Sequence, residues 1–195
     1  MNAAIDISGT VLRTERTLLR PWRDSDLEDL FAYASVDGVG QAAGWRPHPD
    51  REESRRILTR FIARKRTFAL EVGGRAVGSV GIEEYDEKRF PAFDGKRCRQ
   101  LGFVLAKECW GRGLMPEAVC EVLRYLFEDV GLDAVFCAHF LSNKRSARVQ
   151  EKCGFRHLAF GRYETAFGTV EEDETTLLTR EDWLRSRGEA GGGNT

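Results

Sequence analysis

The stretch WGRGLMPEA, residues 110–118, decides the fold. Its glycines Gly111 and Gly113 lack Cβ atoms, so backbone N–H groups can approach a ligand closely. A helix is predicted from Gly113 onward, because apolar residues recur at helical spacing as far as Phe127. The start of such a helix carries unpaired N–H donors and partial positive charge. Loop and helix together predict an anion site suited to a pyrophosphate, where Arg112 adds an ion-pair partner.

The loop allows two other interpretations. A glycine-rich turn can bind no ligand at all, and that interpretation stays open from the loop alone. Other phosphate-binding loops fit poorly, because the chain has neither the GxxxxGK[ST] pattern of a P-loop nor the GxGxxG pattern of a dinucleotide fold.

The second informative stretch is NKRSARVQEKCGF, residues 143–155. It predicts a polar loop, a short helix and a Gly-Phe pair that enters a strand. Asn143 offers an amide that either binds a ligand or caps the helix. The helix is basic in a chain whose net charge is close to zero, and a solvated cationic face is the alternative to a binding role.

The rest of the chain predicts an α/β (α+β) domain of three layers. Strands are expected at 18–21, 67–72, 76–85, 99–106 and 134–140, with two more in 155–179. Two helices fall between the first and second strands, and one helix follows each of the fourth and fifth. Helices then cover both faces of a mixed sheet. A single domain is expected over residues 1–187, followed by a disordered, glycine-rich tail over residues 188–195.

Composition excludes several classes of function. The 30 Lys and Arg residues balance 31 Asp and Glu residues, which argues against nucleic-acid or anionic-membrane binding by bulk charge. The five cysteines are widely spaced and the three histidines show no ligand spacing, so we expect no metal site. There is no signal-peptide pattern and no apolar run of membrane-spanning length, so a cytoplasmic protein is predicted.

The two motifs together resemble the GNAT superfamily, in particular its branch of ribosomal-protein alanine N-acetyltransferases. The branch patterns WGxGxxxEA and NxxSxxVxEKxGF correspond to residues 110–118 and 143–155. The resemblance implies the GNAT fold, in which the sheet is splayed between its fourth and fifth strands. It also implies acetyl-CoA as cosubstrate. The acetyl group would pass to a primary amine, either a protein N-terminus or a small molecule, by direct attack in a ternary complex.

The resemblance also implies where acetyl-CoA binds. Its pantetheine arm would lie in the splay and hydrogen-bond to the fourth strand at Phe103, Val104 and Leu105. The pyrophosphate would bind the backbone N–H groups of five loop residues, namely Gly111, Arg112, Gly113, Leu114 and Met115. Asn143 and Ser146 would approach the thiol end of the cofactor.

Two positions depart from the superfamily pattern. Many members have Tyr as general acid where this chain has Gln150, and in the resembling branch Ser146 is the candidate instead. The branch often has Glu where this chain has Gln100, which cannot act as a base.

We therefore expect the base elsewhere and favour Glu84, because strand alternation carries it to the strand end near the acceptor entry. Glu164 and His139 are the other candidates. A domain that binds acyl-CoA as a sensor or scaffold, without catalysis, is the rival hypothesis. The sequence leaves open the acceptor, the acyl-chain preference and the oligomeric state, for which a homodimer is one option.

Overall fold

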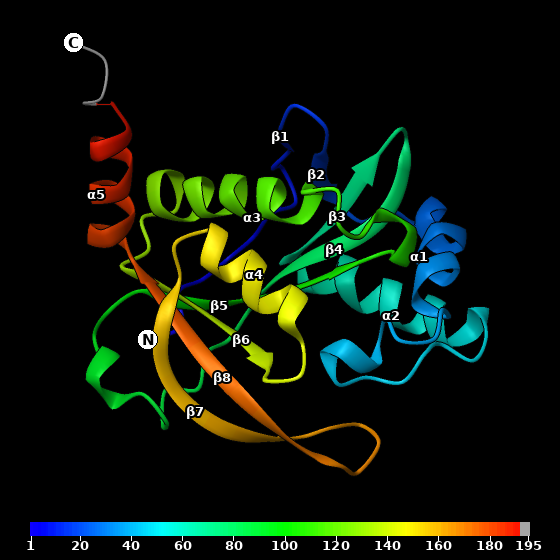
Figure 1. The fold of residues 1–195 in the computed structure, drawn as a ribbon. Helices are drawn as coiled ribbons and strands as arrows, with labels where there is room; N and C mark the ends of the chain where they lie inside the picture. Colours follow the sequence, from blue (N-terminus) through cyan, green and yellow to red (C-terminus); the bar gives the residue numbers. More distant parts are fainter. Residues whose placement is uncertain (192–195) are drawn as a thin grey trace.

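Figure 1 shows the computed structural model, which describes residues 1–191. Eight strands form one sheet in the order β1-β2-β3-β4-β5-β6-β8-β7. They are β1 (Leu12–Arg13), β2 (Leu18–Pro21), β3 (Thr67–Val72), β4 (Arg75–Glu83), β5 (Cys98–Leu105), β6 (Ala134–Phe140), β7 (Arg156–Glu164) and β8 (Val170–Thr179). The helices are α1 (Leu27–Ala34), α2 (Arg51–Arg64), α3 (Leu114–Arg124), α4 (Lys144–Lys152) and α5 (Arg180–Gly191).

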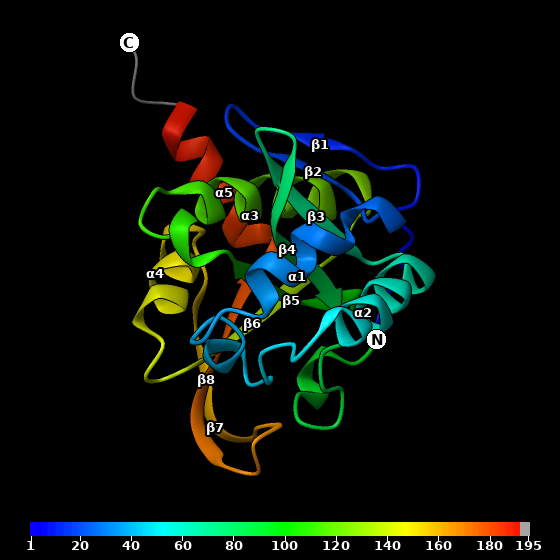
Figure 2. The same ribbon diagram turned by 90° about the vertical axis from the view of Figure 1, so that its right-hand side faces the viewer.

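The sheet lies between two helical layers, as predicted. Helices α1 and α2 cover one face, and α3 and α4 cover the other (Figures 1 and 2). Strand β1 is an addition to the prediction, since two residues are too short for a periodic signal. Within the described residues, no helix is long and apolar enough to cross a membrane.

The predicted splay is confirmed between β5 and β6, which are the fourth and fifth of the strands expected from the sequence. These strands pair in parallel only from Cys98 with Ala134 to Leu101 with Cys137. Beyond that point β5 stays paired with β4, and β6 stays paired with β8. The facing edges of β5 and β6 therefore diverge.

Helix α3 anchors the splayed strands through its apolar face. Its side chains Ala118, Val119, Val122 and Leu123 are buried in the main hydrophobic core. Burying a large aliphatic side chain stabilises a fold by ~1.5–3 kcal/mol. This packing fixes the start of α3, and with it the glycine loop, against the sheet.

A second hydrophobic cluster holds the loop between β4 and β5 in place. Tyr85 stacks on Phe136 of β6 with ring centroids 4.7 Å apart. Phe90 and Phe93 contact the same Phe136 ring at 5.2 and 5.0 Å. The charged loop that the sequence predicts is thereby tied across β6.

Helix α5 was missed by the sequence prediction. The side chain of Thr179 accepts a hydrogen bond from the backbone N–H of Asp182 and donates one to its carboxylate, as a capping pair does. Trp183 is buried 5.4 Å from the Phe127 ring. The predicted domain boundary at residue 187 falls within α5, and residues 192–195 of the predicted tail lie outside the described residues.

Candidate active site

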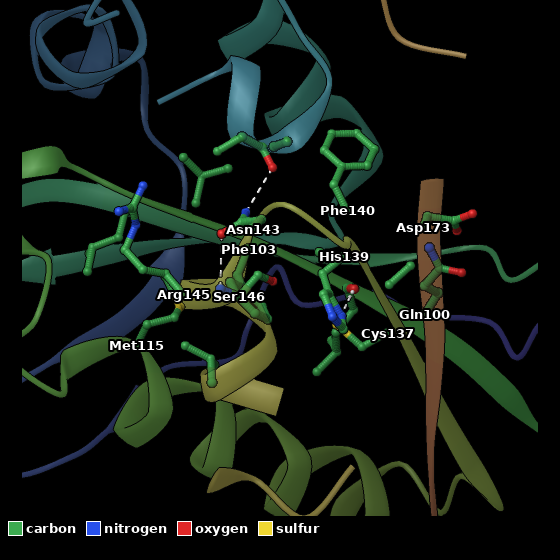
Figure 3. Close-up of a pocket in the computed structure, with 18 of the residues that line it drawn as sticks. Gln100, Phe103, Met115, Cys137, His139, Phe140, Asn143, Arg145, Ser146 and Asp173 are labelled. Carbon is green, nitrogen blue, oxygen red and sulfur yellow. Dashed lines mark hydrogen bonds between the residues drawn. The ribbon is translucent and has the colours of Figure 1, made fainter. Parts of the chain in front are cut away.

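A cavity of about 870 Å³ opens where β5 and β6 diverge. Its walls include β5 from Gln100 to Leu105 and β6 from Cys137 to Phe140. Figure 3 shows Asn143, Arg145 and Ser146 on one side of it, and Gln100 and Asp173 on the other. The structure brings together Glu84, Phe103, Val104, Leu105, Gly111, Gly113, Leu114, Met115, Asn143 and Ser146, all predicted as site residues. Arg112 is exposed and does not line the cavity.

The glycine loop has the backbone shape that its sequence predicts. Gly111 and Gly113 have φ angles of 74° and 77°, in the left-handed region that side chains with a Cβ rarely adopt. Gly113 is the N-cap of α3, and no side chain caps the helix there. The first N–H groups of α3 therefore remain available to an anion.

Cations from α4 face the same part of the cavity. Arg145, Arg148 and Lys152 all line it. The Arg145 guanidinium lies 4.0 Å from the centroid of the Trp110 ring, a cation–π contact that holds it beside the glycine loop. These residues give the α3–α4 end of the cavity a positive character.

Asn143 acts as a helix cap. Its Oδ1 accepts a hydrogen bond from the backbone N–H of Ser146 at 3.1 Å, and its Nδ2 donates to the Ala42 carbonyl at 2.9 Å. Of the two roles that the sequence left open, capping is the one observed. The cap places Ser146 in the first turn of α4, at the cavity.

Gln150 is fully buried, and both the oxygen and the nitrogen of its side-chain amide form hydrogen bonds. The Ala138 carbonyl can only accept, so the Gln150 atom 3.3 Å from it is the Nε2 donor. Oε1 must then accept from Thr176 Oγ1 at 2.7 Å and from His139 Nδ1 at 3.1 Å. His139 therefore carries a hydrogen on Nδ1. The residue that replaces the expected tyrosine organises a polar network beneath the cavity.

The same amide sets the direction of the Ser146 hydroxyl. Gln150 Nε2 donates to Ser146 Oγ at 3.2 Å, so this oxygen acts as an acceptor there. Ser146 Oγ has no other hydrogen-bond partner among the residues that the structure describes. Its own hydrogen is free to be donated to a group in the cavity. The sequence predicts a role for Ser146 but presents Gln150 only as a departure from the superfamily pattern, because its burial cannot be seen in the sequence.

Glu84 lines the cavity at the end of β4, but it is exposed and paired. Arg66 Nη1 donates to Glu84 Oε1 at 2.7 Å. This hydrogen bond and the charge of Arg66 lower the pKa of Glu84 below its usual value. His139 also lines the cavity, whereas Glu164 is exposed and does not.

Comparison with known proteins identifies the family. A model of the acetyltransferase (GNAT) domain matches residues 16–156. The FsC-acetyl coenzyme A-N(2)-transacetylase of Aspergillus fumigatus is 36% identical over 89 residues, which cover 44% of this chain and 38% of that protein. The [ribosomal protein uS5]-alanine N-acetyltransferase of Escherichia coli is 27% identical over 88 residues, which cover 45% of each. The chain thus spans less than half the length of these two relatives.

A solved structure shares the fold. A GNAT-family acetyltransferase from Bacillus anthracis superposes with a TM-score of 0.77 at 19% identity, covering 88% of this chain and 99% of that chain. At this identity the similarity supports the fold alone. The family model, in contrast, spans the sheet from β2 to the start of β7, together with both motifs. The chain belongs to the GNAT family of acetyltransferases.

Proposed function

We propose that the protein transfers the acetyl group of acetyl-CoA to a primary amine by direct attack within a ternary complex. One observation carries the proposal: the gap between β5 and β6 is continuous with the glycine loop at the uncapped start of α3. The gap suits a narrow amide-bearing chain, and the loop suits a pyrophosphate. Pantetheine and pyrophosphate are joined in this order in coenzyme A.

Backbone groups make most of the proposed cofactor contacts. The backbone groups of Val104 point to β4, whereas those of Phe103 and Leu105 point to the cavity, where β6 no longer pairs with β5. The Leu105 carbonyl accepts a hydrogen bond from Trp110 Nε1 at 2.8 Å, so the Leu105 N–H and the Phe103 groups are the ones left for a ligand. A pantetheine arm would hydrogen-bond to this edge of β5 as an added strand. The pyrophosphate would bind the amides of the loop from Gly111 to Met115, aided by the cations of α4.

Ser146 is the proposed donor to the leaving group. Its free hydroxyl hydrogen would be donated to the sulfur as the thiolate forms. The N–H of Leu105 on the cavity side of β5 would bind the oxyanion of the tetrahedral intermediate. The N–H of Val104 points to β4 instead, because Val104 lies opposite Ser79 and the next such donor along the strand, Ala106 N–H, bonds to the Val77 carbonyl. The Ser146 hydroxyl and the Leu105 N–H both act most strongly when charge develops, as transition-state stabilisation requires.

Glu84 is the proposed base. An alkyl ammonium has a pKa of ~10 and must lose a proton before it attacks a thioester. Glu84 follows β4 at the point where Glu83 pairs with Gln100 of β5, and Arg66 lowers the pKa of its carboxylate, which favours the ionised form. The pairing with Arg66 also makes Glu84 a weak base, so ordered water is the competing route for the proton.

Thiol release tests the proposal against the rival of a non-catalytic acyl-CoA-binding domain. The protein would be incubated with acetyl-CoA and a panel of amines, and free coenzyme A would be measured with a thiol reagent. The names of the two relatives indicate different acceptors, so the panel contains peptides with N-terminal alanine and small alkyl amines. Amine-dependent release supports the transferase, and binding of acetyl-CoA without release supports the rival.

A further inference from the structure

Charge is divided along the cavity. The α3–α4 end carries the cations Arg145, Arg148 and Lys152. The opposite end carries four carboxylates and two arginines, namely Glu83, Glu84, Asp86, Asp173, Arg89 and Arg162. The cations at the first end suit a phosphorylated cosubstrate. The carboxylates at the second end suit a cationic group. Among these carboxylates, Asp173 differs in its burial.

Strand register places Asp173 on the face of the sheet away from α4. In β6, His139 contacts Gln150 of α4, so the alternating residues Ala138 and Phe140 face the other way. Asp173 of β8 lies opposite Phe140, and Thr175 lies opposite Ala138. Asp173 therefore approaches the splay from the side opposite the one where Ser146 lies (Figure 3).

The Asp173 carboxylate is buried and incompletely paired. The residue is 6% exposed, and its Oδ1 has no hydrogen-bond partner among the described residues. Its Oδ2 lies 3.7 Å from Arg89 Nη1, which is beyond hydrogen-bond distance. A buried carboxylate oxygen without a donor is costly in a folded protein. A cationic donor brought by a ligand would remove that cost.

Gly161 of β7 lets the Asp173 and Arg89 side chains pack directly against its backbone. A Cβ at Gly161 would lie 2.7 Å from Asp173 Oδ1 and would overlap Arg89 Nη2. Arg89 is held mainly by other groups, because Nη2 donates to the Phe160 carbonyl at 3.1 Å and the guanidinium lies 5.1 Å from the Phe90 ring centroid. The loop between β4 and β5 thus places Arg89 in an ion pair with Asp173 Oδ2 and leaves Oδ1 without a donor.

We propose that Asp173 holds the ammonium group of the acceptor, which is an alkyl amine that enters from the face opposite α4. This rests on the proposed function and adds to it the residue that binds the acceptor. The ammonium would donate to Oδ1, the oxygen that lacks a partner. Gln100, which occupies the expected place of a glutamate, lines the same side and leaves Asp173 as the buried anion there.

Calorimetric binding of two probes tests the assignment in the presence of coenzyme A. The probes are putrescine and a peptide with N-terminal alanine. Asp173→Asn should weaken the binding of both about ten- to hundredfold, the usual effect of losing a hydrogen bond to a charged group. Gly161→Ala should also weaken it, because the new methyl group would overlap both Asp173 Oδ1 and Arg89 Nη2 while the Asp173 charge remains. Steady-state kinetics with the same amines should show the loss mainly in KM.

Glu172→Gln is the matched control, since Glu172 is the exposed neighbour of Asp173 and the same charge is removed. It should leave amine binding unchanged, and all three variants should keep the rise in Tm that acetyl-CoA produces. Unchanged amine affinity in Asp173→Asn would overturn the assignment, as would a wild-type protein that binds neither probe. If the wild-type protein binds both probes and Asp173→Asn does not, but no thiol is released, the result would support Asp173 and refute the proposed transfer.

Discussion

Replacing Gln150 with leucine tests whether the buried amide network holds α4 and Ser146 in place. Leucine is similar in size but provides neither donors nor acceptors. Thr176 keeps a second acceptor in the Cys137 carbonyl, so the groups left without a partner are the Ala138 carbonyl and His139 Nδ1. Each buried unpaired group costs ~1–3 kcal/mol, and added apolar burial offsets part of it, which leaves a loss of about 2–4 kcal/mol.

In a chain of this length, 1 kcal/mol corresponds to a change in Tm of roughly 2–4 °C. Gln150→Leu should therefore lower Tm by about 5–15 °C in a thermal melt followed by circular dichroism. Glu151→Leu is the matched control, because Glu151 is the exposed neighbour on the same helix, and it should change Tm little.

Gln150 should affect kcat by orienting Ser146, whose Oγ accepts a hydrogen bond from the Gln150 amide. Gln150→Leu should lower kcat, and adding Ser146→Ala to it should lower kcat little further, because coupled residues are not additive. A Tm within about 1 °C of wild type would refute the stabilising role of the network. Fully additive kinetic losses would refute the positioning of Ser146 by Gln150.

Gly113→Glu should abolish the rise in Tm produced by acetyl-CoA, since a carboxylate would occupy the anion site; Gly113→Ala carries the same backbone strain at φ 77° and should retain part of the rise. Ser146→Ala should lower kcat more than it raises the KM for acetyl-CoA, and a wild-type kcat would remove Ser146 from the mechanism. Glu84→Gln should cut kcat/KM by ~100-fold at neutral pH, with partial recovery at higher pH, and an unchanged value would assign deprotonation to water. Because Arg66 lowers the folded-state pKa of Glu84, the pair stabilises the fold above pH 4.5, and the Tm difference between Glu84→Gln and wild type should disappear as pH falls through that lowered pKa.

The sequence predicts the fold well where periodicity and glycine chemistry dominate. Residues 110–118 predict both the left-handed glycines and the start of α3, because these follow from backbone geometry that few other residues adopt. Helix α5 was not predicted because its sequence signal is weak. A capping pair of Thr179 with Asp182 marks its start, and Trp183 is its one buried apolar side chain among the residues whose burial is described.

Most residues that the sequence assigns to the cofactor line one cavity, which is the geometry that the assignment requires. Apart from Phe103, Val104 and Leu105 of β5, they follow one another along the two motifs, so their spacing brings them together. On the acceptor side, Arg89 and Asp173 lie on separate elements and meet only through tertiary folding. Neither residue stands out in the sequence, where charged residues are mostly exposed.

Gln150 stands out in the sequence, but its role cannot be predicted from the sequence. The sequence identifies it as a departure from the tyrosine of related enzymes, which points to lost chemistry. The structure instead shows a buried amide with each hydrogen-bonding atom engaged, which orients Ser146. A substitution can be interpreted only together with its hydrogen-bond partners.

Mass spectrometry of the acceptor gives the most direct test of acetyl transfer. The purified protein would be incubated with acetyl-CoA and with either the N-terminal alanine peptide or putrescine, while free thiol is measured in parallel. We predict that at least one amine gains a single acetyl group, in an amount equal to the coenzyme A released, and that Ser146→Ala slows both. Stable binding of acetyl-CoA, with neither acetylated amine nor thiol above the protein-free rate, would contradict the proposed transfer.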